Sequence, residues 1–278
     1  MEQGTLYLVG TPIGNLEDIS LRALKVLKEV DLIAAEDTRH TRKLLSHFNI
    51  HTSLTSYFEH NKKVKGEYII SLLQQGKTVA LVSDAGMPGI SDPGEDIVRE
   101  AVSAGIKVCP IPGPSASLAA LTVSALPTSR FVFEGFLPRD KKERRRRLDL
   151  LKTETRTMIL FESPVRIKDT LQELSEYLGD RQVAVAREMT KRYEEVIRGS
   201  LGEVRSYFQE HSPKGEFTLV LAGATDAKKE VPETEEIKAE LLRLIAAGMT
   251  KKEAVKEVAG RYKISKNEVY KTSLEVNL

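Results

Sequence analysis

The sequence predicts an α/β fold with two α/β domains and a small helical extension. Within the first 117 residues, three short apolar strands each lead into a Gly/Pro-rich loop and then into a helix. This alternation is typical of a βαβ domain with a mostly parallel sheet. Strands with mixed alternation follow to about residue 222 and indicate a second α/β domain with an antiparallel part. We therefore predict domains at 1–127, 128–223 and 234–278, with a linker at 224–233 that is rich in Ala, Lys, Asp and Glu.

Composition narrows the class of protein. The 278 residues are 41% hydrophobic and carry a formal net charge of +2, so the overall charge favours no particular partner. The single cysteine, Cys109, excludes an intramolecular disulfide and fits a reducing cytosol. No signal-peptide pattern is present, and the most apolar stretch, 118–126, is too short to span a bilayer. We expect a cytoplasmic protein without a membrane or DNA partner, and the histidine spacing predicts no metal site.

The elements of the first domain follow from hydrophobic periodicity. Strands are expected at 5–9, 31–35, 78–82 and 106–111, and helices after Asp18 or Ser20 with Leu21, Leu24 and Leu27 on one face, through 64–73 with Gly76 after it, and at 95–104 and 118–125. Glu36-Asp37-Thr38-Arg39 follows the second strand. Such charged residues fit chemistry at the carboxyl end of a strand, and a helix cap by Asp37 or Thr38 explains them equally well.

The loop 83–94 is the feature around which this domain is organised. It reads Ser-Asp-Ala-Gly-Met-Pro-Gly-Ile-Ser-Asp-Pro-Gly and joins the strand at 78–82 to the helix at 95–104. Its glycines permit positive φ or close backbone approach, and its prolines stiffen it. Open α/β sheets bind ligands at such loops, although a tight structural turn has the same composition. None of the three loops contains the Gly-x-Gly-x-x-Gly of dinucleotide-binding proteins.

The second domain and the extension carry more varied signals. Strands are expected at 131–136, 157–161, 182–186, 194–198 and 217–222. Ser163 as N-cap and Pro164 at the first helical position predict a helix to about Leu178. The run 139–147 has seven basic and two acidic residues, which fits a solvated helix face or a phosphate-contacting patch. The three helices expected at 235–247, 250–262 and 265–276 resemble a helix-turn-helix unit, which serves nucleic-acid binding or protein packing.

Seven motifs together resemble the tetrapyrrole-methylase-like, class III S-adenosylmethionine (SAM) methyltransferases. They are Val9-Gly10-Thr11-Pro12-Ile13-Gly14-Asn15, Glu36-Asp37-Thr38-Arg39, the loop 83–94, Pro112-Gly113-Pro114-Ser115-Ala116, Phe161-Glu162-Ser163-Pro164, Arg187-Glu188-Met189-Thr190-Lys191 and Gly215-Glu216-Phe217-Thr218. The resemblance covers residues 5–223, and the helical extension is similar to that of the branch that 2′-O-methylates a cytidine ribose of 16S rRNA in the small ribosomal subunit. It implies SAM as cofactor, a cofactor cleft between the two domains, and a homodimer. A methylase of a small tetrapyrrole-like substrate and a non-catalytic ribosome-binding factor are the alternatives.

The resemblance also implies which residues bind and react. SAM is expected to contact Ile13, Asp84, Gly86, Met87, Ile90, Ser115, Ala116, Phe161, Ala186 and Phe217. Many relatives have Gly-Asp-Pro where this chain has Gly86-Met87-Pro88, so Met87 offers no carboxylate and Asp84 is expected to replace it in part. Methyl transfer to a weakly nucleophilic hydroxyl needs alignment and benefits from a base or a nearby cation. The candidate bases are Asp37, Glu162 and Glu188 and the candidate cations are Arg39, Arg187 and Lys191, and a structural ion pair explains each of them as well.

Overall fold

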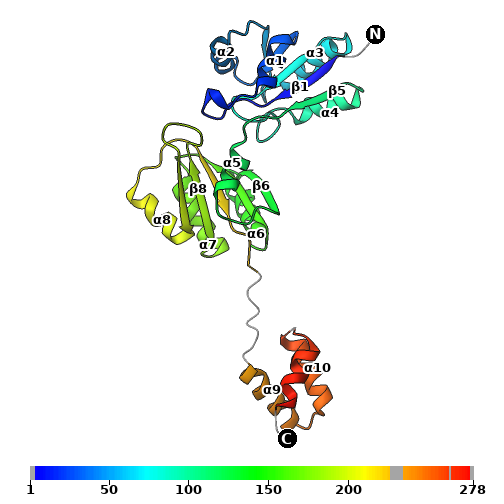
Figure 1. The fold of residues 1–278 in the computed structure, drawn as a ribbon, viewed down its shortest axis with the longest axis vertical. Coiled ribbons are helices and arrows are strands. Elements are labelled where there is room, and N and C mark those ends of the chain that lie inside the picture. The colour runs from blue at the N-terminus through cyan, green and yellow to red at the C-terminus, as the bar shows by residue number, and fades with distance from the viewer. Residues whose placement is uncertain (1–3, 226–233, 263, 276–278) are drawn as a thin grey trace. The chain divides into compact units, whose positions relative to one another are not determined.

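The structure, a computed structural model, describes residues 4–225, 234–262 and 264–275. It divides into two compact units, Met1–Gly223 and Ala224–Leu278; their elements are labelled in Figure 1. Most of the linker expected at 224–233 lies outside the described residues. The boundary expected between residues 127 and 128 stays a prediction.

The first sheet is parallel throughout, with strand order β3-β2-β4-β1-β5. Its strands are β1 (Thr5–Val9), β2 (Leu32–Ala35), β3 (Leu54–Ser56), β4 (Val79–Val82) and β5 (Lys107–Ile111). Every residue of β2 and β4 is buried, because helices cover both faces of the sheet. Four of these strands agree with the sequence prediction, and β3 was not predicted. With three residues of intermediate burial, it is too short to show a period.

Two helix pairs cover this first sheet. Helices α1 (Leu21–Glu29) and α2 (Thr38–His47) pack on one face, and α3 (Lys62–Gln74) and α4 (Glu95–Ser103) pack on the other. The expected apolar face of α1 is partly wrong, because Leu21 is 86% exposed while Ala23 and Leu27 are fully buried. Leu21 lies about 200° around the helix from Ala23, so the buried stripe runs through Ala23 and Leu27 and leaves Leu21 outside it.

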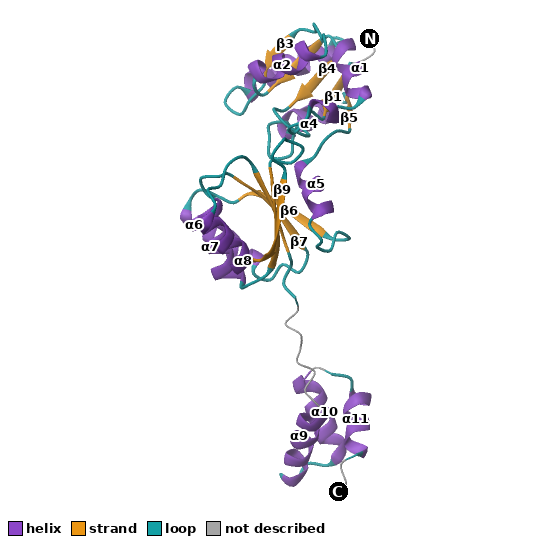
Figure 2. Ribbon diagram, turned by 60° about the vertical axis from the view of Figure 1, so that its left-hand side comes forward, coloured by secondary structure: helices purple, strands orange, loops and turns teal. Residues whose placement is uncertain are grey.

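The second sheet has the order β6-β7-β10-β8-β9, in which only β6 and β7 are parallel neighbours. Its strands are β6 (Phe131–Phe136), β7 (Thr157–Glu162), β8 (Gln182–Arg187), β9 (Glu195–Ser200) and β10 (Phe217–Leu221). Helices α6 (Lys141–Leu151), α7 (Ile167–Leu178) and α8 (Leu201–Glu210) cover one face, and α5 (Ala116–Val123) covers the other, as Figure 2 shows. The antiparallel part is therefore confirmed. Helix α5, which was assigned to the first domain, packs on the second sheet through Ala120 and Leu121.

Helix α7 begins later than the sequence suggested. It starts at Ile167, and residues 164–166 form a turn in which the Ser163 carbonyl accepts from the amides of Arg166 and Ile167. The Ser163 hydroxyl donates to the neighbouring Glu162 carboxylate and makes no cap. Ser163 and Pro164 are consequently left at the end of β7, where they line a cavity.

The second unit consists of α9 (Thr234–Ala246), α10 (Lys251–Tyr262) and α11 (Lys266–Leu274). Leu241, Val258 and Val269 are fully buried between the helices. Both predicted capping boxes are confirmed, at Thr250 with Glu253 and at Ser265 with Glu268. In the described part of the chain, no helix is long and apolar enough to cross a membrane.

Candidate active site

Three loops at the carboxyl ends of strands in the first sheet contact one another through their backbones. The Thr11 amide donates to the Gly86 carbonyl (2.9 Å), and the Gly86 amide donates back to the Thr11 carbonyl (3.1 Å). A Cβ on Gly10 would lie 2.8 Å from the Cα of Gly113, so a side chain at either glycine would separate these two loops. Gly86 has a φ of +79°, which favours glycine at this contact. The stiff loops that follow three strands thus meet.

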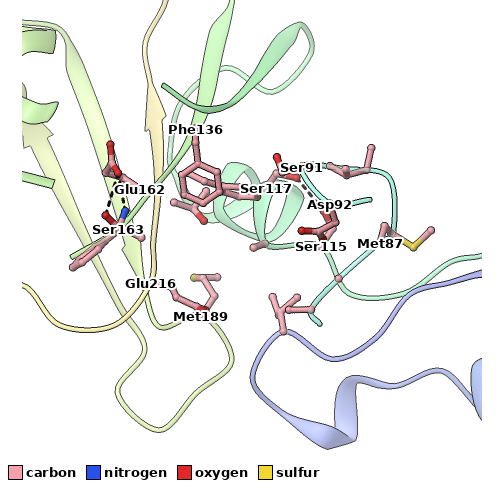
Figure 3. Close-up of a pocket in the computed structure, with 18 of the residues that line it drawn as sticks. Met87, Ser91, Asp92, Ser115, Ser117, Phe136, Glu162, Ser163, Met189 and Glu216 are labelled. Atoms are coloured by element: carbon pink, nitrogen blue, oxygen red, sulfur yellow. Dashed lines mark hydrogen bonds between the residues drawn. The ribbon is translucent and has the colours of Figure 1, made fainter. Parts of the chain in front are cut away.

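A cavity of about 320 Å³, here called the first cavity, lies between these loops and the second sheet. Figure 3 shows Phe136, Glu162 and Met189 on one side of it and Met87, Asp92 and Ser115 on the other. The predicted cofactor residues that line it are Ile13, Gly86, Met87, Ile90, Ser115, Ala116, Phe161 and Phe217. Their contact with a cofactor stays a prediction.

Two predicted cofactor residues, Asp84 and Ala186, do not line the first cavity. Ala186 is 1% exposed and packs in the core beneath α5 with Ala120 and Val220. Its side chain is therefore separated from the cavity by this packing. Asp84 lies on a second cavity described below.

The first cavity combines aromatic rings with hydroxyl groups. The ring centroids of Phe136 and Phe161 are 5.7 Å apart, and the Ser115 and Ser117 hydroxyls are 3.0 Å apart. The lining residues that were not predicted are Ala85, Ser91, Asp92, Ser117, Phe136, Ser163, Pro164, Met189, Glu216 and Thr218. Most of them belong to the motifs already recognised, so membership of a motif was the available signal. Ser117 directly follows one of those motifs, and Phe136 lies outside all of them.

Carboxylates gather where β2 and β4 end. Burial, together with the charges of Glu36 and Asp84, raises the pKa of Asp92 to about 6, although a hydrogen bond from Ser83 opposes the rise. Burial, with the charge of Asp84, also raises the pKa of Glu36. Asp92 faces the first cavity, so the charge of that cavity changes near pH 6.

A second cavity of about 440 Å³ adjoins the first and shares Ile13, Ala85 and Glu216 with it. Asp84 and Lys191 line this second cavity from opposite sheets. His40 and Lys43 of α2 contribute basic side chains to its wall. The two cavities therefore lie side by side, and the second is lined by more charged side chains than the first.

Lys191 is held between two carboxylates. Its Nζ lies 3.0 Å from Glu188 Oε1 and 3.0 Å from Glu216 Oε2. Burial lowers the pKa of Lys191, but the hydrogen bonds to both carboxylates outweigh it, so the pKa lies above its ordinary value. Burial raises the pKa of Glu188, and the hydrogen bonds from Lys191 and from the Glu216 amide bring it below its ordinary value. Glu188 and Lys191 therefore form a charged pair, and Lys191 presents a cation to the second cavity.

The loop that carries this pair has an unusual backbone. Glu188 and Thr190 have φ values of 51° and 65°, a region that costs non-glycine residues free energy. A Cβ on Gly14 would overlap Lys191 Cγ, so this loop packs directly against the first loop of the other sheet. Such strain is common at functional sites.

Glu162 lines the first cavity but is already fully bonded. Its Oε1 accepts from the Ser163 amide (2.8 Å) and pairs with Arg166 (3.5 Å), and its Oε2 accepts from the Thr170 hydroxyl (2.6 Å). The residue is 3% exposed. This geometry suits an anchor for the start of α7 better than a base that must accept a proton from a substrate.

Four candidates, Asp37, Arg39, Arg187 and Glu188, lie outside both cavities. Asp37 caps α2 and pairs with Arg39 (2.7 Å), whose hydrogen bonds hold the pKa of the Asp37 carboxyl well below its ordinary value. The cap is therefore present. Arg187 donates to the Lys214 carbonyl (2.8 Å) and pairs with Glu195 (3.3 Å). Among the six catalytic candidates, only Glu162 and Lys191 line a cavity.

The sequence of residues 5–205 matches the family described as Tetrapyrrole (Corrin/Porphyrin) Methylases. The chain belongs to this tetrapyrrole methylase family. Similar family members include proteins named Ribosomal RNA small subunit methyltransferase I. The one from Halalkalibacterium halodurans is 50% identical over 97% of this chain and 94% of its own length, and the one from Bacillus subtilis is 48% identical over the same shares. The one from Thermotoga maritima is 54% identical and covers 79% of this chain and 99% of its own length.

Two solved structures share the fold. Uroporphyrin-III C-methyltransferase from Thermus thermophilus has a TM-score of 0.54 at 20% identity, covering 78% of this chain and 94% of its own. Diphthine synthase has a TM-score of 0.60 at 19% identity, covering 79% and 90%. The predicted fold class is thereby confirmed. Within the described residues of this methylase, no group of three or more His, Cys, Asp or Glu side chains is placed to hold a metal ion.

Proposed function

We propose that this methylase transfers the methyl group of SAM to the ribose 2′-hydroxyl of a cytidine in the 16S rRNA of the small ribosomal subunit. Relatives at 48–54% identity are named as small-subunit rRNA methyltransferases. Their similarity extends over 79–97% of this chain, which supports the same activity here. A homodimer in the cytoplasm belongs to the same proposal.

The first cavity suits SAM by its chemistry and size. Phe136, Phe161 and Ile13 supply apolar surface for a flat base, and the Ser115 and Ser117 hydroxyls supply hydrogen-bonding groups for a sugar or an amino-acid moiety. Asp92 adds a carboxylate that suits a cationic ligand. A volume of about 320 Å³ lies within the range of small-molecule sites. When bound, SAM supplies a methyl group activated by a positive sulfur.

The single observation that carries the proposal is the adjoining second cavity. It shares Ile13, Ala85 and Glu216 with the first, so a nucleotide there would meet a ligand in the first cavity at their common wall. Alignment of two reactants accounts for much of the rate enhancement in such displacements. Asp84 is the carboxylate of the second cavity that we assign as base for the 2′-hydroxyl, and Lys191 is the cation of that cavity that stabilises the negative charge on the oxygen.

The test is methyl transfer from labelled SAM into small-subunit RNA by the wild type, Asp84→Asn and Asp37→Asn. Loss of a positioned base lowers kcat by roughly 10²–10⁴-fold, so this loss is expected for Asp84→Asn with SAM affinity by calorimetry unchanged. Asp37→Asn is the control, because asparagine also caps helices and Asp37 lies outside both cavities. Label found only in a porphyrinoid would support the small-substrate alternative. Tight RNA binding without SAM affinity would support a non-catalytic factor.

A further inference from the structure

The second unit has a basic depression on its surface. A hollow of about 540 Å³ lies between the first turns of α10 and α11. It is lined by Lys251, Lys252, Val255, Lys256, Lys266 and Tyr270, and we call it the lysine hollow. It has no part in the candidate active site, whose residues all belong to the first unit.

In the part of the chain that the structure describes, the lysines of the hollow make no ion pair, in contrast to other cations of the same unit. Lys238 pairs with Glu235 and Glu275, and Arg243 and Arg261 both pair with Glu240. Within residues 4–225, 234–262 and 264–275, no carboxylate lies within ion-pair distance of a lysine of the hollow. Four positive charges are thus concentrated on one surface without internal neutralisation, which attracts a polyanion.

Two acidic side chains of α10 and α11 are committed elsewhere. Glu253 accepts hydrogen bonds from the Thr250 amide and hydroxyl, and Glu268 accepts from the Ser265 amide. They cap the two helices and do not line the hollow. Because α10 and α11 both begin here, the positive ends of their dipoles add to the field of the lysines.

The hollow also contains an aromatic side chain. Tyr270 is 53% exposed although it is a large hydrophobic residue. A basic groove with an exposed aromatic ring is how proteins hold single-stranded nucleic acid, since lysines contact phosphates and the ring stacks on a base. An acidic protein partner would have no use for a stacking platform, so the observations favour RNA.

One relative lacks a segment about as long as the second unit. The Thermotoga maritima relative matches 79% of this chain with 99% of its own length over 220 residues. This relative has the same name as the longer relatives described above, yet about a fifth of this chain has no equivalent in it. The second unit makes up about the same share of the chain. A module that the reaction does not require, and that carries a basic aromatic hollow, fits a role in substrate docking.

From these observations we propose that the lysine hollow docks a single-stranded segment of the RNA substrate, with its lysines on the phosphodiester backbone and Tyr270 stacked on a base. This inference rests on the proposed function only for the identity of the RNA. It assigns to the second unit a binding site apart from the catalytic one.

The test uses the full chain with all four lysines of the hollow changed to alanine. The probes are a single-stranded RNA oligonucleotide and 16S rRNA, titrated at several salt concentrations. Each lost phosphate contact lowers the slope of log affinity against log salt by about 0.7 for single strands, so the slope should fall by up to about 3. Tyr270→Ala should weaken binding about tenfold, and Tyr270→Phe should restore it, since phenylalanine also stacks.

Matched single variants provide the control. Lys266→Ala and Lys271→Ala remove one exposed lysine each from α11, but only Lys266 lines the hollow. Lys266→Ala should lower the slope and Lys271→Ala should leave it unchanged. SAM affinity measured by calorimetry should be that of the wild type in every variant.

The outcomes separate this inference from the proposed function. Wild-type affinity and salt slope in the four-lysine variant would overturn the docking role, whatever the methylation result. A wild-type chain that methylates no RNA would overturn the proposed function. If such a chain still lost RNA affinity on removal of the lysines, the docking role would stand.

Discussion

At the scale of single residues, Asp92 should make stability depend on pH in a definite direction. Its pKa is about 6 in the folded chain against an ordinary value of 3.8. Between pH 4 and 6 the folded state keeps a proton that the unfolded state releases, so the free energy of unfolding falls as pH rises through this window. Asn cannot ionise. Urea unfolding at pH 4, 5, 6 and 7 should show the wild type losing stability relative to Asp92→Asn. A difference that stays constant with pH would contradict this.

Gly215 should tolerate alanine less well than another glycine of the same unit. Gly215 has a φ of +85°, and an added Cβ would overlap the Glu188 carboxylate that binds Lys191. Gly179 has a φ of +78° with nothing within 4 Å of such a Cβ, so Gly179→Ala reports the backbone cost alone, about 1–2 kcal/mol. Gly215→Ala should lower the free energy of unfolding by more, measured by chemical denaturation. Equal losses would show that the Glu188 contact is not restrictive.

At the scale of elements, α6 should divide into residues for stability and residues for RNA. Arg144 is buried and donates to Thr170 (2.8 Å), and it also pairs with Glu173. Arg145 and Arg146 are exposed. Arg144→Ala should destabilise the protein by about 2 kcal/mol or more, because it removes hydrogen bonds to a charged buried group. Arg145→Ala with Arg146→Ala should stay within about 0.5 kcal/mol.

The same pair of variants distinguishes the two interpretations of the basic run at 139–147. If the exposed arginines contact phosphates, the Arg145→Ala and Arg146→Ala double variant should bind RNA more weakly and with a smaller salt slope. Filter binding at several salt concentrations measures both quantities. Unchanged affinity and salt slope would leave a solvated helix face as the remaining interpretation of this basic run.

Most elements could be predicted because their periodicity was strong and their ends were marked. Strand β1 was located from an apolar run, and α11 from the capping box at Ser265. What failed depended on tertiary context. The face of α1 is set by which residues pack in the core, Ala23 and Leu27 rather than Leu21, and Ser163 does not cap α7 because residues 164–166 form a turn before the helix begins at Ile167. Neither choice is encoded in local sequence.

The site was predictable where backbone loops form it and less so where side chains do. Gly86 and Ser115 line the first cavity because their loops follow β4 and β5, the two parallel strands on either side of β1. The positions of charged residues in the sequence did not show which of them line the site, because ion pairs within the fold decide where their side chains point. Arg39 turns to its cap residue Asp37, whereas Lys191 is held over the second cavity by two carboxylates. Only the folded chain distinguishes these cases.

At the scale of the whole molecule, the first unit should bind SAM without the second. Both cavities are lined only by residues of the first unit, and its hydrophobic cores contain none from the second. A chain ending at Gly223 should therefore unfold cooperatively and bind SAM with the affinity of the full chain, as calorimetry would measure.

The kinetics of RNA methylation by that shortened chain should show what the second unit does. If the second unit only docks substrate, its removal raises KM for RNA and leaves kcat unchanged, because interactions made equally in the ground and transition states affect binding alone. The full chain with the four lysines of the hollow changed to alanine should show the same change in KM. A drop in kcat for the shortened chain, with KM unchanged, would instead mean that the second unit acts on the reacting groups, and the division of labour between the two units would be wrong.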